Sequence, residues 1–547
     1  MKSKRLTLSV LFVVAAVANA LACTNLIVGK NASADGSTIV SYSADSYGLF
    51  GELYHYPAGM HKKGTLIDIH EWDTGKYLGQ IAQARQTYNV IGNMNEFQLT
   101  IGETTFGGRP ELVDTTGIID YGSLIYLGLQ RSRTAREAIK VMTELVQEYG
   151  YYSSGESFTI ADPNEIWIME MIGKGPGVRG AVWVAVRVPD DCISAHANQS
   201  RIHQFNMNDK ENCMYSVDVI SFAREKGYFD GVNKDFSFAD AYAPLDFGAR
   251  RYCEARVWSY FNMFTDRGNE FLPYILGETN TPMPLFVKPN RKVSVQDVKN
   301  AMRDHYEGTP LDISKDFGAG PYHTPYRLSP LSFKVGDREY FNERPISTQQ
   351  SGFVFVAQMR SELPDPIGGV LWFGTDDANM TVFTPVYCCT DKVPVCYTRV
   401  DGADYITFSW NSAFWIFNWV ANMVYPRYDL MIDDVRATQT ELETTFNEAQ
   451  EGVEAAAAKL LEKDPAKAKA FLTNYTNMTA QSTFDTWKRL GEFLVVKYND
   501  GVVKRMKNGQ FERNSIGQPA GVIRPGYPKE FLEEYVKQTG DRYKMPE

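Results

Sequence analysis

The stretch Cys23-Thr-Asn-Leu-Ile-Val-Gly29 directly follows Ala20-Leu21-Ala22, and the chain is organised around this junction. Upstream, three basic residues precede an apolar run over 6–18, and Ala20-x-Ala22 forms a small-residue cleavage site. Together these features are typical of a secretory signal peptide. Cleavage after Ala22 makes Cys23 the first residue of a strand-like, β-branched run. A residue with both a thiol and a free α-amine carries its own nucleophile and its own base.

Two other uses of Cys23 stay open. It could be a buried or disulfide-bonded cysteine that happens to follow a cleavage site. It could also be the lipid anchor of a bacterial lipoprotein, which would consume the thiol and normally the amine and leave a non-catalytic binding module. Lipoprotein signals usually have leucine or a similar residue three positions before the cysteine, whereas this chain has Ala20. We therefore favour catalysis and predict an exported protein, periplasmic or secreted.

The composition argues against several classes of partner. The chain has 547 residues, a net charge of −10 and no basic run, so nucleic acid is not expected as a partner. The run 6–18 is too short to span a membrane, and the longest later apolar stretch, 412–425, is interrupted by two asparagines. No Cys-x-x-Cys or His-Glu-x-x-His motif occurs and the seven histidines are scattered, so we expect neither a metal nor a cofactor. The oligomeric state is left open, a homo-oligomer included.

Six cysteines remain besides Cys23, an even number in a chain expected to be exported. Disulfides persist in such compartments, so we expect at least one disulfide while Cys23 stays free. The loops that are easiest to close join Cys192 with Cys213, and Cys388 or Cys389 with Cys396.

The apolar periodicity predicts strands, then helices, then strands, and finally a helical part. Strands are expected over 24–28, 38–42, 87–101 (around a turn at 92–96), 158–172, 181–188 and 192–198, and later over 352–359, 369–375 and 380–386. Helical spacing covers 124–149, with a capping box from Thr134 to Glu137, and C-terminal helices are expected over 433–462, from 465, and over 482–498. We predict a signal peptide over 1–22, a catalytic domain over 23–425 and a helical C-terminal part over 426–547. This order favours layered sheets over a parallel βαβ fold.

The chemistry of an N-terminal cysteine needs no histidine. An α-amine titrates near 7.7–8.0 and a thiol near 8.5, so the two groups can exchange a proton near neutral pH. The papain-type motif Cys-Gly-x-Cys-Trp is absent around Cys23, and Gly-x-Ser-x-Gly occurs nowhere.

Residues 23–38, Cys-Thr-Asn-Leu-Ile-Val-Gly-Lys-Asn-Ala-Ser-Ala-Asp-Gly-Ser-Thr, resemble the N-terminal-nucleophile (Ntn) cysteine dipeptidases, the dipeptidase A and secernin group. The resemblance continues in Met-Asn-Glu (94–96), Glu-Thr-Thr-Phe-Gly (103–107), Ala-Asn-Gln-Ser-Arg-Ile (197–202), Arg-Asp-His-Tyr-Glu-Gly-Thr (303–309), Gln-Met-Arg (358–360) and Val-Leu-Trp-Phe-Gly (370–374). It implies an α+β fold, a four-layer αββα Ntn-hydrolase sandwich of antiparallel sheets, to which this chain adds its helical C-terminal part. It also implies hydrolysis of dipeptides or small peptides through an acyl-enzyme. Penicillin V acylase and bile salt hydrolase belong to the wider superfamily, so an amidase or acylase is the alternative.

The family pattern assigns roles to matching positions. Cys23 would be nucleophile and base together, and Asp45 would hold its α-amine. Asn95 would help form the oxyanion hole, and Asn198 would position the amine or the substrate. One arginine, Arg251 or Arg256, would complete the site.

Tyr42 departs from that pattern. It lies three positions before Asp45, where these dipeptidases often carry arginine, and it cannot hold a thiolate by charge. Either another arginine serves or the site has a different polarity. Three glutamates, Glu96, Glu103 and Glu170, are interpreted as solvated carboxylates rather than as ligands for a substrate ammonium.

Overall fold

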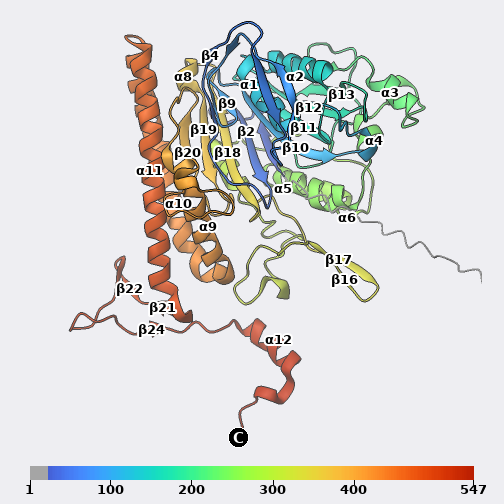
Figure 1. The fold of residues 1–547 in the computed structure, drawn as a ribbon. Coiled ribbons are helices and arrows are strands. Elements are labelled where there is room, and N and C mark those ends of the chain that lie inside the picture. The colour runs from blue at the N-terminus through green and yellow to red at the C-terminus, as the bar shows by residue number, and fades with distance from the viewer. Residues whose placement is uncertain (1–22) are drawn as a thin grey trace, which may run out of the picture.

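The computed structural model describes residues 23–547 as a mixed α+β protein with antiparallel sheets and long C-terminal helices (Figure 1). The predicted signal peptide, residues 1–22, lies outside the described residues. None of the helices in the described part is both long enough and apolar enough to cross a membrane.

The first sheet contains the strand that Cys23 precedes. Its six antiparallel strands run in the order β14 (Ile193–His196), β1 (Asn25–Val28), β2 (Thr38–Asp45), β18 (Ser351–Met359), β19 (Val370–Thr375) and β20 (Thr384–Tyr387). The pairing places Ile27 opposite Val40, and a turn with Gly36 at φ +79° connects the two strands. The predicted hairpin is confirmed, but β2 continues to Asp45 because β18 pairs with it along its whole length.

The second sheet has eight antiparallel strands. Their order is β15 (Cys213–Tyr215), β13 (Ala181–Arg187), β12 (Ile166–Gly173), β11 (Gly155–Ala161), β10 (Thr100–Gly107), β9 (Met94–Asn95), β8 (Val90–Ile91) and β3 (His55–Tyr56). The single strand predicted over 158–172 is wrong, because it is a hairpin of β11 and β12. The Asp162 carboxylate accepts hydrogen bonds from the backbone amides of Asn164 and Glu165 and so forms the turn.

Two helices pack on this second sheet, α1 (Tyr121–Arg131) and α2 (Ala135–Tyr149). The side chain of Thr134 accepts a hydrogen bond from the Glu137 amide, so Thr134 caps α2 and ends the continuity expected over 124–149. The other half of the predicted capping box is wrong, because the Glu137 carboxylate accepts from the amide of Arg133 instead. Leu124 and Met142 of the helices share one hydrophobic cluster with Phe158 and Trp167 of the strands.

The two sheets meet next to β1. The Asn25 side chain donates a hydrogen bond of 2.7 Å to the carbonyl of Glu103, and His196 lies between the hydroxyls of Thr104 and Thr159, 2.7 Å from each. A side chain at Gly102 would lie 2.5 Å from the Asn25 amide oxygen, so this close approach requires glycine.

The C-terminal part is built from α9 (Ala413–Val424), α10 (Tyr428–Leu461) and α11 (Pro465–Tyr498), which lie beside β19 and β20 (Figure 1). The separate helix predicted over 482–498 is wrong: α11 is one helix of 34 residues, because neither glycine nor proline interrupts its pattern before Gly491. Met431 and Trp487 belong to the same hydrophobic cluster as Ile27. The boundary at 425/426 stays a prediction.

The remaining elements are short. They are β4 (Gly59–Met60), β5 (Leu66–His70), β6 (Tyr77–Ala82), β7 (Gln86–Thr87), α3 (Val219–Glu225), α4 (Phe238–Tyr242), α5 (Ala255–Phe264), α6 (Gly268–Leu276), α7 (Val295–Ala301), β16 (Ser332–Val335), β17 (Arg338–Phe341), α8 (Asp365–Gly368), β21 (Val503–Lys504), β22 (Met506–Lys507), β23 (Gln510–Phe511), β24 (Val522–Ile523) and α12 (Lys529–Thr539).

The predicted disulfide is contradicted. All seven cysteines, each within residues 23–547, are free. The Cys388 thiol, for example, donates a hydrogen bond of 3.0 Å to the carbonyl of Asp365 instead of meeting Cys396. Cysteines that lie close in sequence are directed into different surroundings by the strands and loops that carry them.

Candidate active site

Cys23 lies at the open end of β1, between the two sheets. Thr24 bridges to Ser43 of β2, so the sheet fixes the backbone on one side of the cysteine. The side chain is 3% exposed, and its Sγ lies 3.7 Å from the hydroxyl of Tyr42. Burial raises the pKa of the thiol well above its usual value. The negative charges of Glu103 and Asp45 raise it further, whereas the Asp45 backbone amide and the Tyr42 hydroxyl lower it. The thiol is therefore protonated at neutral pH.

Arg256 holds the backbone of this cysteine. Its guanidinium donates hydrogen bonds to the carbonyl of Cys23 (2.6 Å) and to the hydroxyl of Thr24 (2.7 Å). The other terminal nitrogen donates to the carbonyl of Ala197 and the side-chain oxygen of Asn198, both at 2.9 Å. Arg256 is 1% exposed, and its pKa of about 10, lowered by burial, leaves it charged at neutral pH. One buried cation thus joins β1 to the end of β14.

Asn198 turns the chain where β14 ends. Its φ of +65° is in the left-handed region, which asparagine tolerates better than most residues. Its amide nitrogen donates a hydrogen bond of 2.8 Å to the carbonyl of Thr105, so Asn198 links β10 to Arg256. The structure therefore brings the predicted residues Cys23, Asn198 and Arg256 together.

Asp45 is the last residue of β2 and is 1% exposed. Its carboxylate accepts hydrogen bonds of 2.5 Å from Arg344 and from the Ser351 hydroxyl, and one of 3.1 Å from the Ser43 hydroxyl. The ion pair with Arg344 balances the charge of the aspartate and fixes its orientation near Cys23. Arg344 was not among the residues expected from the sequence.

The second candidate arginine has a different place. Arg251 forms an ion pair with Glu343 and lies 4.9 Å from the ring centre of Phe341, in the segment Ala249–Glu254 that precedes α5. Of the two arginines proposed from the sequence, the structure places Arg256 at Cys23.

Asn95 does not have the geometry of an oxyanion donor. Its amide nitrogen donates to the carbonyls of Leu129 and Ser132, both at 2.8 Å, and its oxygen accepts from the amides of Phe97 and Leu99. Both of its N–H groups are therefore used in joining the turn after β9 to the end of α1. The fully buried asparagine is a structural turn residue.

Glu103 is a buried neighbour of the thiol and not the solvated carboxylate that the sequence predicts. The Tyr42 hydroxyl donates a hydrogen bond of 2.6 Å to its carboxylate, and Glu103 is 1% exposed, so the expectation of a solvated group is wrong. Burial raises the pKa of Glu103 to about 7 despite hydrogen bonds from Tyr42, Glu156 and Cys23. Glu170 is also buried, and the amides of Arg201 and Ile202 and the hydroxyl of Ser200 bind it. The signal in the sequence was position: Glu103 lies two residues after the core residue Ile101, on the same face of its strand.

Most of the chain matches the model of one known protein family. The model of peptidase family C69 matches residues 22–55 and 50–441 of the chain. The chain belongs to this family. The predicted resemblance to the dipeptidase A group is thereby confirmed.

Several curated relatives of the C69 chain are similar over most of its length. A probable dipeptidase of Salmonella dublin is 29% identical over 395 residues, which cover 67% of this chain and 81% of the relative. A probable dipeptidase of Latilactobacillus sakei is 26% identical over 429 residues, 74% and 82% of the two chains. Dipeptidase A of Lactobacillus helveticus is 24% identical over 416 residues, 72% and 80% of the two chains.

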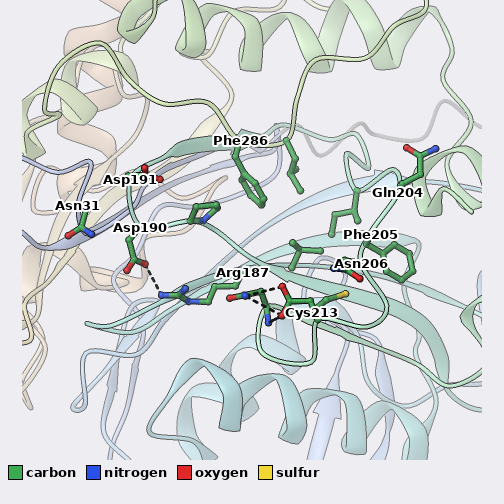
Figure 2. A pocket seen from close by; sticks show the side chains of 15 residues that line it. Asn31, Arg187, Asp190, Asp191, Gln204, Phe205, Asn206, Cys213 and Phe286 are labelled. Atoms are coloured by element: carbon green, nitrogen blue, oxygen red, sulfur yellow. Dashed lines mark hydrogen bonds and ion pairs between the residues drawn. The ribbon is translucent and has the colours of Figure 1, made fainter. Parts of the chain in front are cut away.

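The C69 chain also has a hollow of about 620 Å³ beside β13 and β15 (Figure 2). Arg187 pairs with Asp190 across 2.7 Å at its wall, and Phe205, Cys213 and Phe286 also line it. Neither Cys23 nor any residue described above as its neighbour lines this hollow.

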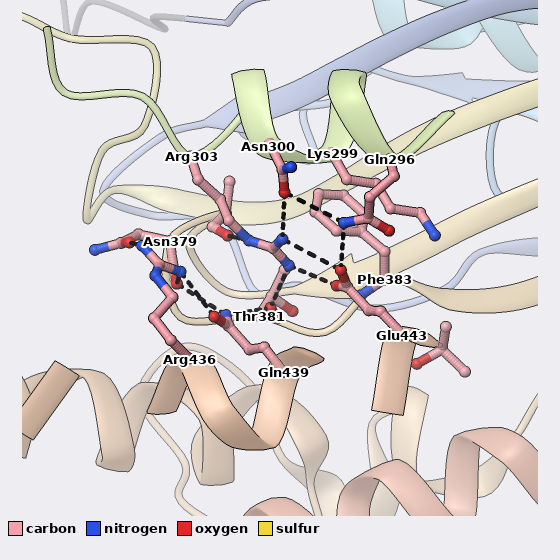
Figure 3. Close-up of polar contacts among 12 residues, drawn as sticks. Gln296, Lys299, Asn300, Arg303, Asn379, Thr381, Phe383, Arg436, Gln439 and Glu443 are labelled. Atoms are coloured by element: carbon pink, nitrogen blue, oxygen red, sulfur yellow. Dashed lines mark hydrogen bonds and ion pairs between the residues drawn. The ribbon is translucent and has the colours of Figure 1, made fainter. Parts of the chain in front are cut away.

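The block at 303–309 joins α10 to the sheets of the C69 fold. The guanidinium of Arg303 donates hydrogen bonds of 2.5 and 3.2 Å to Glu443 of α10 and also to the carbonyls of Ala378 and Thr381 (Figure 3). Gln439, one turn before Glu443, donates to the carbonyl of Thr381 as well. Arg303 of this block therefore docks α10 against the segment between β19 and β20.

Proposed function

We propose that the protein is an exported cysteine dipeptidase in which Cys23, as the mature N-terminal residue, is the nucleophile and its α-amine the general base. One observation carries this proposal. Burial keeps the thiol protonated, and the neighbours within residues 23–547 that shift its pKa most, Glu103, Asp45 and Tyr42, include no histidine. The thiol therefore needs a base held at contact distance. An α-amine, which titrates near 7.7–8.0, is such a base once the preceding residues are removed.

The reaction follows from this assignment. The amine accepts the thiol proton as Sγ attacks the carbonyl of the first substrate residue and the C–S bond forms. The proton passes to the nitrogen of the second residue, and the peptide C–N bond breaks. Water then attacks the thioester with the same amine as base, which releases the first amino acid and restores the thiol. Arg256 holds the cysteine backbone throughout, and Asp45, oriented by Arg344, holds the amine.

The fold supports the same proposal. We infer a four-layer αββα arrangement in which the two antiparallel sheets form the middle layers. The contacts of Asn25 with Glu103 and of His196 with Thr104 and Thr159 join the sheets. Helices α1 and α2 pack on the eight-stranded sheet, and α5, α7, α9 and α11 contact the six-stranded one. Cys23 then lies at the end of a central strand.

Dipeptides are the proposed substrates because the similar curated proteins carry the names dipeptidase and probable dipeptidase. An acylase that acts on bile-acid or penicillin amides is the alternative within the enzymes. A panel of dipeptides assayed beside those amides separates the two activities.

The addition of one residue before Cys23 tests the mechanism, because it converts the α-amine into an amide. The chain is expressed with an uncleavable glycine before Cys23, its N-terminus is confirmed by mass spectrometry and its fold by circular dichroism. An amide nitrogen cannot accept the thiol proton, so dipeptide hydrolysis should be abolished in the folded, extended protein. Mass spectrometry of the exported protein should show an unmodified N-terminal Cys23. Full activity of the extended protein, or a lipid on Cys23, refutes the proposal.

A further inference from the structure

Three carboxyl groups form what we call the acidic cluster: Glu103, which lies beside the thiol, and its neighbours Glu156 and Asp73. Glu103 and Glu156 lie diagonally opposite each other on the same face of β10 and β11, since Thr105 pairs with Glu156 in the register. Each is 1% exposed. Asp73, in the turn between β5 and β6, is exposed. The Tyr121 hydroxyl donates a hydrogen bond of 2.9 Å to Asp73, and Tyr121 in turn lies within electrostatic reach of both glutamates.

No cation of the described chain balances this cluster. Within residues 23–547, Tyr42 donates to Glu103 (2.6 Å), Thr105 to Glu156 (2.7 Å) and Tyr121 to Asp73. Glu103 also shares hydrogen bonds with Glu156 and the Cys23 thiol, and none of these partners is a cation. The second carboxylate oxygen, Oε2, of each glutamate is buried without a protein donor. Buried carboxylates in proteins are normally paired with a cation or fully hydrogen-bonded, because burial of an unpaired charge is costly. The cluster is thus built to receive a cationic group from outside.

We propose that Glu103 and Glu156 bind the α-ammonium of the first substrate residue, so that the enzyme requires peptides with a free N-terminus. The inference rests on the proposed dipeptidase function and specifies its substrates. The α-ammonium of a peptide is two bonds from the carbonyl that the thiol attacks. A group that recognises it must therefore lie within about two hydrogen-bond lengths of the nucleophile. Glu103 meets this condition, because the Tyr42 hydroxyl contacts both the Cys23 thiol and the Glu103 carboxylate.

The rest of the cluster supports the same ligand. Burial and the charge of Glu103 raise the pKa of Glu156 well above its usual value, so Glu156 stays protonated beside a charged Glu103. One charge matches one ammonium. Asp73 extends the negative potential from the surface toward the thiol, which favours the approach of a cationic N-terminus.

This arrangement also explains why tyrosine is acceptable at position 42. An arginine there would neutralise Glu103 and occupy the place of the substrate's ammonium. Tyr42 keeps the contact with the thiol and leaves the charge of Glu103 available.

The test compares an unmodified dipeptide with its N-acetylated form in the mature wild-type enzyme and in Glu103→Gln and Glu156→Gln. Glutamine keeps the size of each side chain, and its amide can donate to the neighbouring glutamate, so both variants should fold; thermal unfolding checks this. Glu111→Gln is the matched control, because the Glu111 carboxylate also accepts a hydrogen bond from a tyrosine, Tyr228, outside the acidic cluster.

The wild type should cleave the free dipeptide at least ~100-fold more efficiently than the acetylated one. Each cluster variant should lose ~100-fold in kcat/KM for the free dipeptide, mainly through KM, and stay within about threefold for the acetylated one. The control should change neither value. Equal losses of kcat/KM for both substrates would mean that Glu103 acts on the thiol. Equal cleavage of both substrates by the wild type would mean that the enzyme does not recognise the substrate ammonium. Either result overturns the proposal.

Binding separates this inference from the proposed function. Calorimetry on the inactive Cys23→Ala variant measures the affinity for both dipeptides without turnover. If the wild type hydrolyses no dipeptide, the dipeptidase proposal fails. The ammonium site is nevertheless supported when only the free dipeptide binds and Glu103→Gln abolishes that binding, and it is refuted when both forms bind equally or neither binds.

Discussion

Replacement of Arg256 by lysine tests whether one guanidinium organises the nucleophile. Arg256 serves four acceptors through its two terminal nitrogens: the carbonyls of Cys23 and Ala197, the Thr24 hydroxyl and the Asn198 side chain. Its Nε also donates to the carbonyl of Tyr252. A lysine ammonium has three N–H donors, so at least two of these five acceptors lose their donor. At ~1–3 kcal/mol for each unsatisfied group, the free energy of unfolding should fall by about 3 kcal/mol, a large part of the ~5–15 kcal/mol that is typical of domains.

The same loss should appear in catalysis, because two of the acceptors belong to Cys23 and Thr24. If all of it affects the transition state, about 3 kcal/mol corresponds to a ~100-fold lower kcat/KM for dipeptide hydrolysis. Urea unfolding and steady-state kinetics on the same preparation measure both quantities. Arg251→Lys is the control, since Arg251 binds Glu343 and keeps its charge as lysine; it should cost about 1 kcal/mol and change kcat/KM less than threefold. An Arg256→Lys enzyme with wild-type kinetics and stability, or an Arg251→Lys enzyme that is the more impaired, would refute the reasoning.

Three further outcomes are expected. Asn95→Ala should destabilise the protein by ~2–4 kcal/mol in urea unfolding, because four buried backbone groups lose their partner. The folded variant should keep kcat within a few-fold of the wild type. A ~100-fold loss of kcat without destabilisation would instead show that Asn95 is an oxyanion donor. The pKa of Glu103 is raised to about 7, so this carboxylate gains its charge as the pH rises through 7, and KM for a free dipeptide should fall there and rise again above about 8 where the substrate amine loses its proton. KM profiles from pH 5.5 to 9 check this, and a profile that Glu103→Gln leaves unchanged would contradict it. The other titratable groups around the cluster are Cys23, Tyr42, Tyr121, Tyr151, Glu71, Asp120 and Glu156. Thiol titration of the denatured protein should find seven free cysteines, whereas five or fewer would show that a disulfide forms.

Much of the framework could be predicted from local sequence. The β-branched run after Cys23 pairs as a hairpin with β2, and Thr134 caps α2, because strand periodicity and capping depend on residues within a few positions of one another. Failures at this level are also local. The apolar pattern continues through the Asp162 turn and hides it, and the amphipathic pattern of α11 is too weak along 34 residues to show one continuous helix.

The sequence predicts some residues of the candidate site but not others. Cys23, Asn198 and an arginine of 250–256 were expected from the family's motifs, and the structure joins Cys23 to Arg256 and Arg256 to Asn198 by hydrogen bonds. Sequence could not choose between Arg251 and Arg256, because they differ by little more than one helical turn and only the packing of α5 against β14 decides which reaches Cys23. Nor could it show that Asn95 is consumed by carbonyls at the end of α1.

The sequence by itself thus predicts that Cys23 is both nucleophile and base, because the expected cleavage site and the cysteine adjoin along the chain. Only the tertiary structure decided the polarity around that cysteine. Tyr42 and Glu103 are 61 positions apart, and they meet because Gly102 lets β10 approach β1 and β2 without a side chain between them. Such contacts depend on strand register and on the closeness of two sheets, which are properties of the whole fold and leave no short-range pattern in the chain.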